Sequence, residues 1–183
     1  MSSASTETSS EPRQRLFFAL WPDDGVRSRL DDASEGLLGR RVKRVPAANL
    51  HLTLAFAGSV TASVRQCLET AAAGIRCPAF ELGIGHIGHW SRPRIFWAGP
   101  TQTPSALWSL AGLLKSALGD CGLQMETRAY QPHITLARKI ARPPQAVCME
   151  PVAWSIGHFC LVESVTGPTA ASYRILASWE LEG

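Results

Sequence analysis

Apolar residues recur at helical spacing in three stretches of the chain. In the first stretch Val26, Leu30, Ala33 and Leu37 fall at i, i+4, i+7 and i+11, and Gly39 follows. The segment Pro22-Asp23-Asp24 precedes them, so proline and acids occupy the predicted first turn and glycine marks the end. A second helix is predicted from near Thr61 to before Pro78, and a third after Thr103-Pro104. Their inward positions are Val64, Leu68, Ala71 and Ile75 in the second helix and Leu107, Leu110, Leu114 and Leu118 in the third.

Shorter apolar segments before, between and after these helices are typical of β-strands. They cover residues 15–21, 50–57, 80–87, 94–98, 133–137, 154–163 and 173–179. The strands cluster in pairs joined by glycine or proline turns, as at residues 88–93. This clustering favours an α+β fold with antiparallel sheet over a strictly alternating parallel sheet.

One local pattern occurs twice. Asn49-Leu-His-Leu-Thr-Leu-Ala-Phe56 is repeated 82 residues later as Gln131-Pro-His-Ile-Thr-Leu-Ala-Arg138. Each copy follows a predicted strand and helix, which indicates two similar halves that face each other. We therefore expect each half to contribute one His-x-Thr strand to a shared cleft.

The repeated residues have side chains suited to phosphodiester chemistry. In a strand His51 and Thr53 share one face and the aliphatic residues between them share the other, and the same holds for His133 and Thr135. One neutral imidazole can take a proton from water while the other, protonated, donates to the leaving oxygen. We predict His51 and His133 as the catalytic pair, with His51 as acid and His133 as base, although the quasi-symmetry leaves that order open. The two threonine hydroxyls and Arg138 are predicted to bind the phosphate.

These segments resemble the two signature motifs of the 2H phosphoesterase superfamily. The flanking segments Arg15-Leu-Phe-Phe-Ala-Leu20, Pro93-Arg-Ile-Phe-Trp-Ala-Gly99 and 173–181 resemble the RNA 2′,3′-cyclic phosphodiesterases, also called 2′-5′ RNA ligases. The resemblance implies a bilobed fold of two pseudo-symmetric lobes of antiparallel sheet, with flanking helices around a central cleft. It also implies metal-independent hydrolysis of RNA 2′,3′-cyclic phosphate ends to 2′-phosphate ends, with weak reverse 2′-5′ ligation. No cofactor is expected.

Composition fits one compact domain. The chain has 183 residues, 45% of them hydrophobic, and a net charge of +3, which permits an anionic ligand without demanding one. We expect residues 1–14 to be a disordered tail and residues 15–183 to form a single bilobed domain. The five scattered cysteines lack a C-x-x-C pair, which argues against a zinc site or a disulfide framework and suits a reducing compartment. We therefore predict a cytoplasmic monomer that makes no membrane contact.

The sequence has other features that could contribute to function. Phe17, Phe18, Trp90 and Trp97 could stack on a nucleobase, although such residues more often belong to a core, and Phe18 is the candidate we select. The basic run at 40–44 is a candidate for tracking RNA phosphates or simply a solvated loop. His86 and His89 lie three residues apart but lack further ligands, so no metal site is predicted. Two alternatives stay open: the same fold acting on a small cyclic-phosphate nucleotide, and a non-catalytic module that binds RNA ends.

Overall fold

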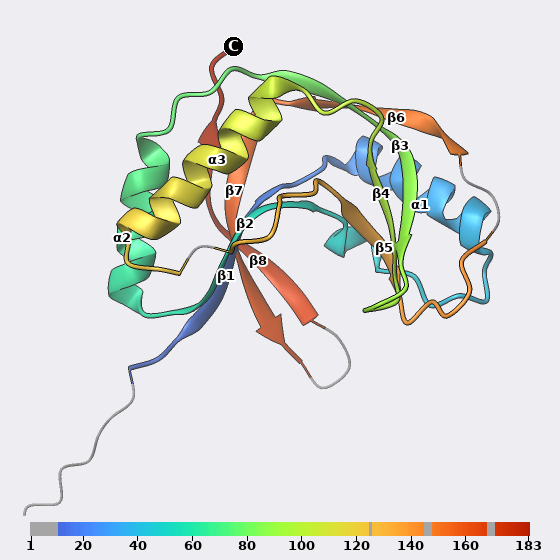
Figure 1. Cartoon of the computed structure of the whole chain (residues 1–183), viewed down its shortest axis with the longest axis horizontal. Helices are drawn as coiled ribbons and strands as arrows, with labels where there is room; N and C mark the ends of the chain where they lie inside the picture. The colour runs from blue at the N-terminus through green and yellow to red at the C-terminus, as the bar shows by residue number, and fades with distance from the viewer. Residues whose placement is uncertain (1–10, 125, 145–147, 168–170) are drawn as a thin grey trace, which may run out of the picture.

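The computed structural model describes residues 11–124, 126–144, 148–167 and 171–183 (Figure 1). Residues 1–10 of the predicted tail lie outside the described residues, and the first strand includes Gln14, one residue earlier than expected. The helices are α1 (Asp24–Leu38), the short 3-10 helix η1 (Ala47–Asn49), α2 (Ala62–Ala73) and α3 (Ser105–Asp120). The strands are β1 (Gln14–Leu20), β2 (Leu52–Val60), β3 (Phe80–Trp90), β4 (Ile95–Pro100), β5 (Ile134–Arg138), β6 (Cys148–Ile156), β7 (His158–Thr166) and β8 (Ala171–Glu180).

The helices begin where the sequence predicts. The Asp23 side chain accepts a hydrogen bond from the Val26 amide at 2.8 Å, and the Thr61 hydroxyl accepts one from the Val64 amide, so each residue caps the helix that follows it. The predicted inward face of α3 is confirmed, because Leu107, Leu110, Leu114 and Leu118 are all buried. The predicted end of α2 is late, since the helix stops at Ala73.

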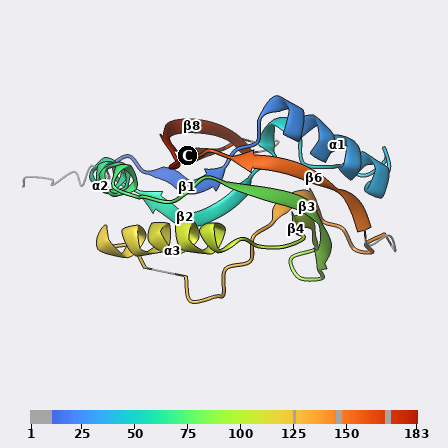
Figure 2. The same cartoon turned by 90° about the horizontal axis from the view of Figure 1, so that it is seen from above.

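In the described part of the chain, eight strands form one antiparallel sheet in the order β6-β3-β4-β5-β2-β1-β7-β8. The sheet curls, as Figures 1 and 2 show. Its two halves have matching order outward from the centre: β2, β1, β7, β8 on one side and β5, β4, β3, β6 on the other. The predicted arrangement of two quasi-equivalent antiparallel lobes is confirmed.

The crossover helices connect the two halves. α1 joins β1 to β2 in the first half but packs against β6 of the second half. α3 joins β4 to β5 in the second half but packs against β2 of the first, and α2 packs against α3. A single buried cluster includes residues of both halves, among them Leu16, Leu30, Phe96 and Leu114. The two lobes therefore share one core, which holds β2 and β5 at the centre.

The expectation of one strand over residues 154–163 is wrong. The structure has two strands there, β6 and β7, which separate at Gly157 and lie at different places in the sheet. Both strands bury apolar side chains, for example Trp154 and Phe159, so the apolar run continues through the break. Only the glycine indicated a change of direction.

The expectation against disulfide pairing is also wrong. Cys67 of α2 is bonded to Cys121, the residue that caps α3, and 54 positions separate the two cysteines. Their contact depends on how α2 packs against α3, which no local spacing in the sequence reveals. Cys77 and Cys160 are free and buried.

Candidate active site

The centre of the sheet brings the two His-x-Thr motifs together. Leu52 of β2 pairs with Ile134 of β5, and both are fully buried on the core side. The flanking histidines and threonines are only partly buried, as the alternation of a strand requires. Continuing the antiparallel register by one residue places His51 beside Thr135 and His133 beside Thr53. The four polar residues of the two motifs, His51, Thr53, His133 and Thr135, therefore lie together on one face at the centre of the sheet.

An aromatic cage surrounds His51. Its ring is stacked on Trp21 with centroids 5.2 Å apart, and the rings of Phe17 and Tyr173 each lie 5.0 Å away. Its Nδ1 lies 2.7 Å from the backbone oxygen of Asn49. Because a carbonyl oxygen only accepts hydrogen bonds, Nδ1 carries the proton and donates it. Nε2 is then the nitrogen left for chemistry.

His133 repeats this arrangement in the other half. Its Nδ1 donates to the backbone oxygen of Gln131 at 2.8 Å, again two residues upstream. Trp90 meets its ring edge-on at 4.6 Å, and Trp97 lies at 6.3 Å. The two imidazoles are therefore oriented by equivalent backbone contacts, each with Nε2 available.

Burial makes both imidazoles weak bases. Loss of hydration lowers the pKa of His51 to about 4, opposed in part by the bond to Asn49, and the charges of His133 and Arg138 lower it further. Burial also lowers the pKa of His133, and Arg138 adds to that effect. Both rings are neutral near pH 7 when the site holds no anion.

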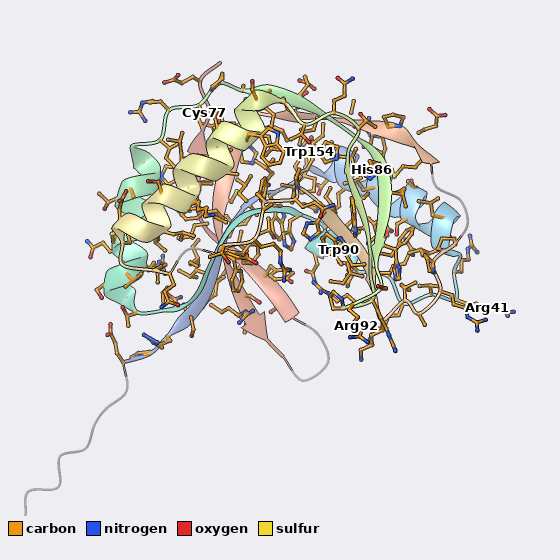
Figure 3. The ribbon with its side chains drawn as sticks, viewed as in Figure 1. Arg41, Cys77, His86, Trp90, Arg92 and Trp154 are labelled. Atoms are coloured by element: carbon orange, nitrogen blue, oxygen red, sulfur yellow. A yellow bond between two sulfur atoms is a disulfide. The ribbon has the colours of Figure 1, made fainter. Side chains whose placement is uncertain are left out.

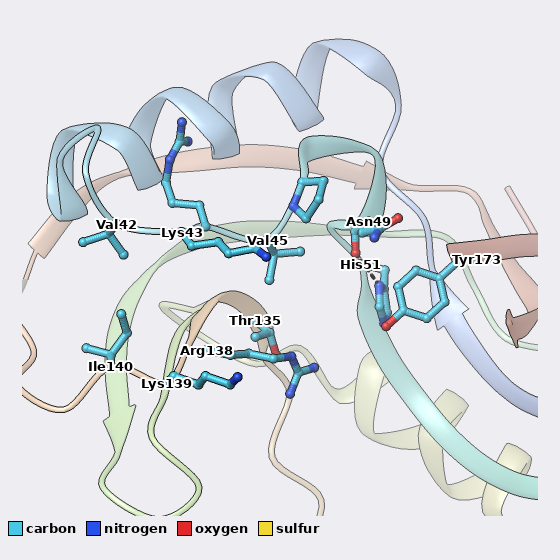
Figure 4. A pocket seen from close by; sticks show the side chains of 12 residues that line it. Val42, Lys43, Val45, Asn49, His51, Thr135, Arg138, Lys139, Ile140 and Tyr173 are labelled. Carbon is cyan, nitrogen blue, oxygen red and sulfur yellow. Dashed lines mark hydrogen bonds between the residues drawn. The ribbon is translucent and has the colours of Figure 1, made fainter. Parts of the chain in front are cut away.

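A pocket of about 540 Å³ opens beside His51. Thr135, Arg138 and Tyr173 also line it, and Figure 4 shows the Arg138 side chain extending toward His51 and Tyr173. No aspartate or glutamate is among the described residues that line it. The pocket therefore combines a hydroxyl and a guanidinium, which can bind an anion, with an imidazole, which can transfer a proton during hydrolysis.

Thr53 and His133 are not among the residues lining this pocket. The backbone oxygen of Thr53 accepts a hydrogen bond from the Tyr130 hydroxyl at 3.1 Å. A second hollow of about 230 Å³ lies beside the segment leading to His133 and is lined by Gln131, Pro132 and Tyr130 among others. His51 and Thr135 thus line the larger hollow, and the segment just before His133 lines the smaller one.

The prediction that Phe18 stacks on a base is wrong. Phe18 is fully buried in the main core, where its ring lies 6.3 Å from Phe159 and 6.0 Å from Trp179. Its neighbour Phe17 points to the opposite face of β1 and contacts His51. Sequence reasoning also missed Trp21, although its spacing of four from Phe17 places both on one face of an extended strand.

No group of three or more His, Cys, Asp or Glu side chains in the described ranges is arranged to hold a metal ion. His89 bonds instead to the backbone oxygen of Ile140 at 2.9 Å, and the His86 ring lies 5.5 Å from Trp97. Across the same ranges, no helix has both the length and the apolar character needed to span a membrane.

A sheet of two quasi-equivalent halves, each placing one His-x-Thr strand at the centre, defines the class of two-histidine phosphoesterases. The sequence model of the 2'-5' RNA ligase superfamily matches residues 22–168, and the chain belongs to this superfamily. The RNA 2',3'-cyclic phosphodiesterase of Escherichia coli (strain K12) is 36% identical to it, over 94% of this chain and 98% of that protein.

Solved structures agree with this assignment. A crystal structure of a phosphoesterase superposes with a TM-score of 0.85 at 33% identity, covering 93% of this chain and 99% of that one. E. coli LigT complexed with 3'-AMP gives a TM-score of 0.81 at 32% identity, covering 93% of this chain and 99% of that one. The predicted family and fold are both confirmed.

Proposed function

We propose that this protein hydrolyses the 2′,3′-cyclic phosphate ends of RNA to 2′-phosphate ends without a metal. The observation that carries the proposal is the pair of imidazoles at the start of the two central strands. Each has Nδ1 bound to a backbone oxygen, and no described residue forms a hydrogen bond with its Nε2. Hydrolysis of a phosphodiester needs one proton acceptor and one proton donor, and the pair supplies both. The name of the E. coli relative supports the choice of substrate.

In this proposal His133 acts as the base and His51 as the acid. Nε2 of His133 removes a proton from water, and the water oxygen forms a bond to phosphorus. The bond between phosphorus and O3′ breaks, and the protonated Nε2 of His51 gives its proton to O3′. The phosphate remains on O2′, and the histidines return to their starting states by proton exchange with solvent.

The remaining site residues stabilise negative charge on the non-bridging oxygens. The hydroxyls of Thr53 and Thr135 donate hydrogen bonds, and the Arg138 guanidinium supplies charge and planar donors. The extension of Arg138 into the pocket toward His51 supports this role (Figure 4).

Binding of the anionic substrate favours protonation of His51 by solvent. The pKa of His51 is about 4 because burial disfavours its cation. An anionic phosphate beside the ring favours the cation and raises that pKa toward neutrality. The donor form thus develops when a cyclic phosphate occupies the site.

A 5′-hydroxyl in place of water would form a 2′-5′ bond by the same displacement. We include this weak ligation in the proposal because nothing in the proton transfers distinguishes water from an alcohol. We also place the enzyme in the cytoplasm, since RNA is its proposed substrate, and propose that it acts as a monomer, since one chain supplies both histidines.

The direct test is product analysis on a cyclic-ended oligonucleotide with chelator present. We expect a 2′-phosphate end, resolved from the 3′ isomer by ³¹P NMR. His51→Ala and His133→Ala should each reduce turnover by at least about 10³-fold. His158→Ala is the matched control, because His158 is exposed at the start of β7.

Several outcomes would contradict the proposal. A 3′-phosphate product would reverse the assigned leaving group, and loss of turnover in chelator would indicate a metal. Retained turnover in both histidine variants would remove the mechanism. Tight binding of the oligonucleotide with no product would favour the non-catalytic alternative. The thermal unfolding midpoint of each variant should stay close to that of the parent.

A further inference from the structure

The basic run at residues 40–44 separates into different roles in the structure. The Arg44 guanidinium bonds to the carboxylates of Asp31 and Glu35 on α1, and Arg40 bonds to Glu35 at 2.8 Å. Arg41 points away from the body of the molecule, as Figure 3 shows. Lys43 lines the pocket beside His51 (Figure 4). In the sequence these basic residues cannot be told apart. In the structure only Lys43 and Arg44 of the run line the pocket, and two carboxylates neutralise Arg44. Lys43 is therefore the residue of the run whose charge is available to a ligand in the pocket.

The wall that carries Lys43 is fixed in place. Arg44 pairs with Ala137 of β5, and the Val45 amide donates to the Leu136 backbone oxygen at 2.7 Å. These contacts attach the segment to the edge of β5, while the ion pairs of Arg44 attach it to α1. The backbone next to Lys43 is therefore held in place by β5 and α1.

The opposite wall follows directly from β5. Lys139 has a left-handed backbone, with φ of 63°, which is uncommon for a residue with a side chain. The chain then turns, and the Ile140 amide donates to the Arg94 backbone oxygen at 3.0 Å. In Figure 4 the Lys139 side chain extends beside Arg138 into the same pocket. Two lysines from different segments thus border one hollow.

The lining between these lysines is apolar. Val42, Val45 and Ile140 contribute aliphatic surface, and the described lining holds no carboxylate. At about 540 Å³ the pocket is far larger than one phosphate needs and lies in the range that holds a nucleotide-sized ligand. The smaller hollow near Gln131 has neither lysine nor arginine among its described lining residues, so it offers nothing comparable to a polyanion.

We propose that this pocket binds the RNA chain on the 5′ side of the cyclic end. Lys43 and Lys139 hold the phosphodiester of the terminal nucleotide, and the aliphatic side chains contact the preceding base. A cyclic phosphate occupies the 3′ end of RNA, so the rest of the chain must leave the site in the 5′ direction. The inference rests on the proposed function and adds a preference for RNA over a cyclic mononucleotide, which leaves this subsite empty.

The test compares kcat/KM for 2′,3′-cyclic AMP with kcat/KM for a triadenylate carrying a 2′,3′-cyclic end. We expect the parent protein to favour the trinucleotide by at least about tenfold at low salt. Lys43→Ala and Lys139→Asn should each lower this ratio roughly fivefold. Asparagine is chosen at 139 because it tolerates the left-handed backbone while removing the charge. Arg41→Ala is the matched control and should leave the ratio unchanged.

Salt provides an independent readout. Each lost phosphate contact should reduce the slope of log kcat/KM for the trinucleotide against log salt by about 0.7. A parent protein that hydrolyses both substrates equally well would overturn the inference while leaving the proposed function intact. Equal loss on both substrates in the lysine variants would also overturn it, because it would place the lysines at the reacting phosphate. Failure to hydrolyse either substrate would instead refute the proposed function.

Discussion

The imidazole of His51 lies flat against the indole of Trp21, with centroids 5.2 Å apart and planes 5° from parallel. Trp21 belongs to a small cluster on the site side of the sheet, where Phe17, Cys160 and Tyr173 also pack. The cluster keeps water from one face of the imidazole. Trp21 thereby contributes to the burial that lowers the pKa of His51 and fixes the direction of Nε2.

Trp21→Leu should therefore weaken turnover through His51. We expect kcat to fall about tenfold, because a tilted imidazole misaligns the proton transfer. We also expect the pKa of His51, followed by NMR of its ring protons, to rise from about 4 toward 6.5 as water reaches the ring. Leu113→Ala is the control, since Leu113 is an exposed residue of α3 that lines neither hollow. An unchanged His51 pKa in the Trp21 variant would show that the indole plays no part in positioning or burying the ring.

A substrate with a different leaving group shows which histidine is the acid and which is the base. A nitrophenyl phosphodiester expels a stable phenolate that needs no proton, so it bypasses the general acid but still needs the base. If His51 is the acid, the loss of activity caused by His51→Ala should be at least about tenfold smaller on this substrate than on the cyclic phosphate. The loss caused by His133→Ala should be equally large on both substrates. A smaller loss in the His133 variant alone would reverse the assignment and leave the rest of the mechanism unchanged.

The low pKa of His51 predicts a dependence of stability on pH. The unfolded chain binds the proton at a pKa near 6.5, whereas the folded chain binds it only near 4. Between these values the unfolded state holds more protons, so the free energy of unfolding rises with pH and is highest above about pH 6.5. At pH 5 the cost should be about 1–2 kcal/mol relative to pH 7.5, allowing for partial exposure of the ring.

Chemical denaturation at the two pH values measures this effect. In His51→Gln the fall in stability from pH 7.5 to pH 5 should be smaller than in the parent by that amount. Glu163, whose pKa is lowered mainly by its hydrogen bond with Gln14, adds its own loss at lower pH. That loss occurs in both proteins and cancels in the comparison. Identical pH dependence in the two proteins would mean that the His51 pKa is not lowered in the folded state.

Much of the site could be predicted because it depends on a repeated local pattern. In both motifs leucine or isoleucine alternates with histidine and threonine, so the buried and partly exposed faces of β2 and β5 could be assigned without a structure. The direct pairing of Leu52 with Ile134 depends on tertiary structure, but two similar halves made it a natural arrangement. The stripe on α3 was equally clear because one face of that helix is almost entirely leucine.

The site predictions fail where the sequence does not alternate between apolar and polar residues, or where a contact depends on the fold. In β1 every residue from Leu16 to Leu20 is buried, so the sequence does not show which phenylalanine faces the core. The sequence offers both Phe17 and Phe18 for the base, and only the structure shows that Phe17 is the one on the side of His51. Tyr173 was not proposed as a site residue because its contact with His51 depends on a strand more than 120 positions away, β8. The role of Arg44 likewise depends on acids of α1 that only the fold brings near.

The bond between Cys67 and Cys121 should stabilise the packing of α2 against α3. Because it closes a loop of 54 residues, its removal should lower the free energy of unfolding by about 2–4 kcal/mol. Reductant should lower the thermal unfolding midpoint of the parent by roughly 5–10 °C. Cys67→Ser should show the lowered midpoint already and respond no further to reductant. Hydrolysis of 2′,3′-cyclic AMP at 25 °C should persist in this variant, because the rings around both histidines come from β1, Trp21, β3, β4 and β8. A parent midpoint that does not depend on reductant would show that the bridge does not form or does not constrain the unfolded chain.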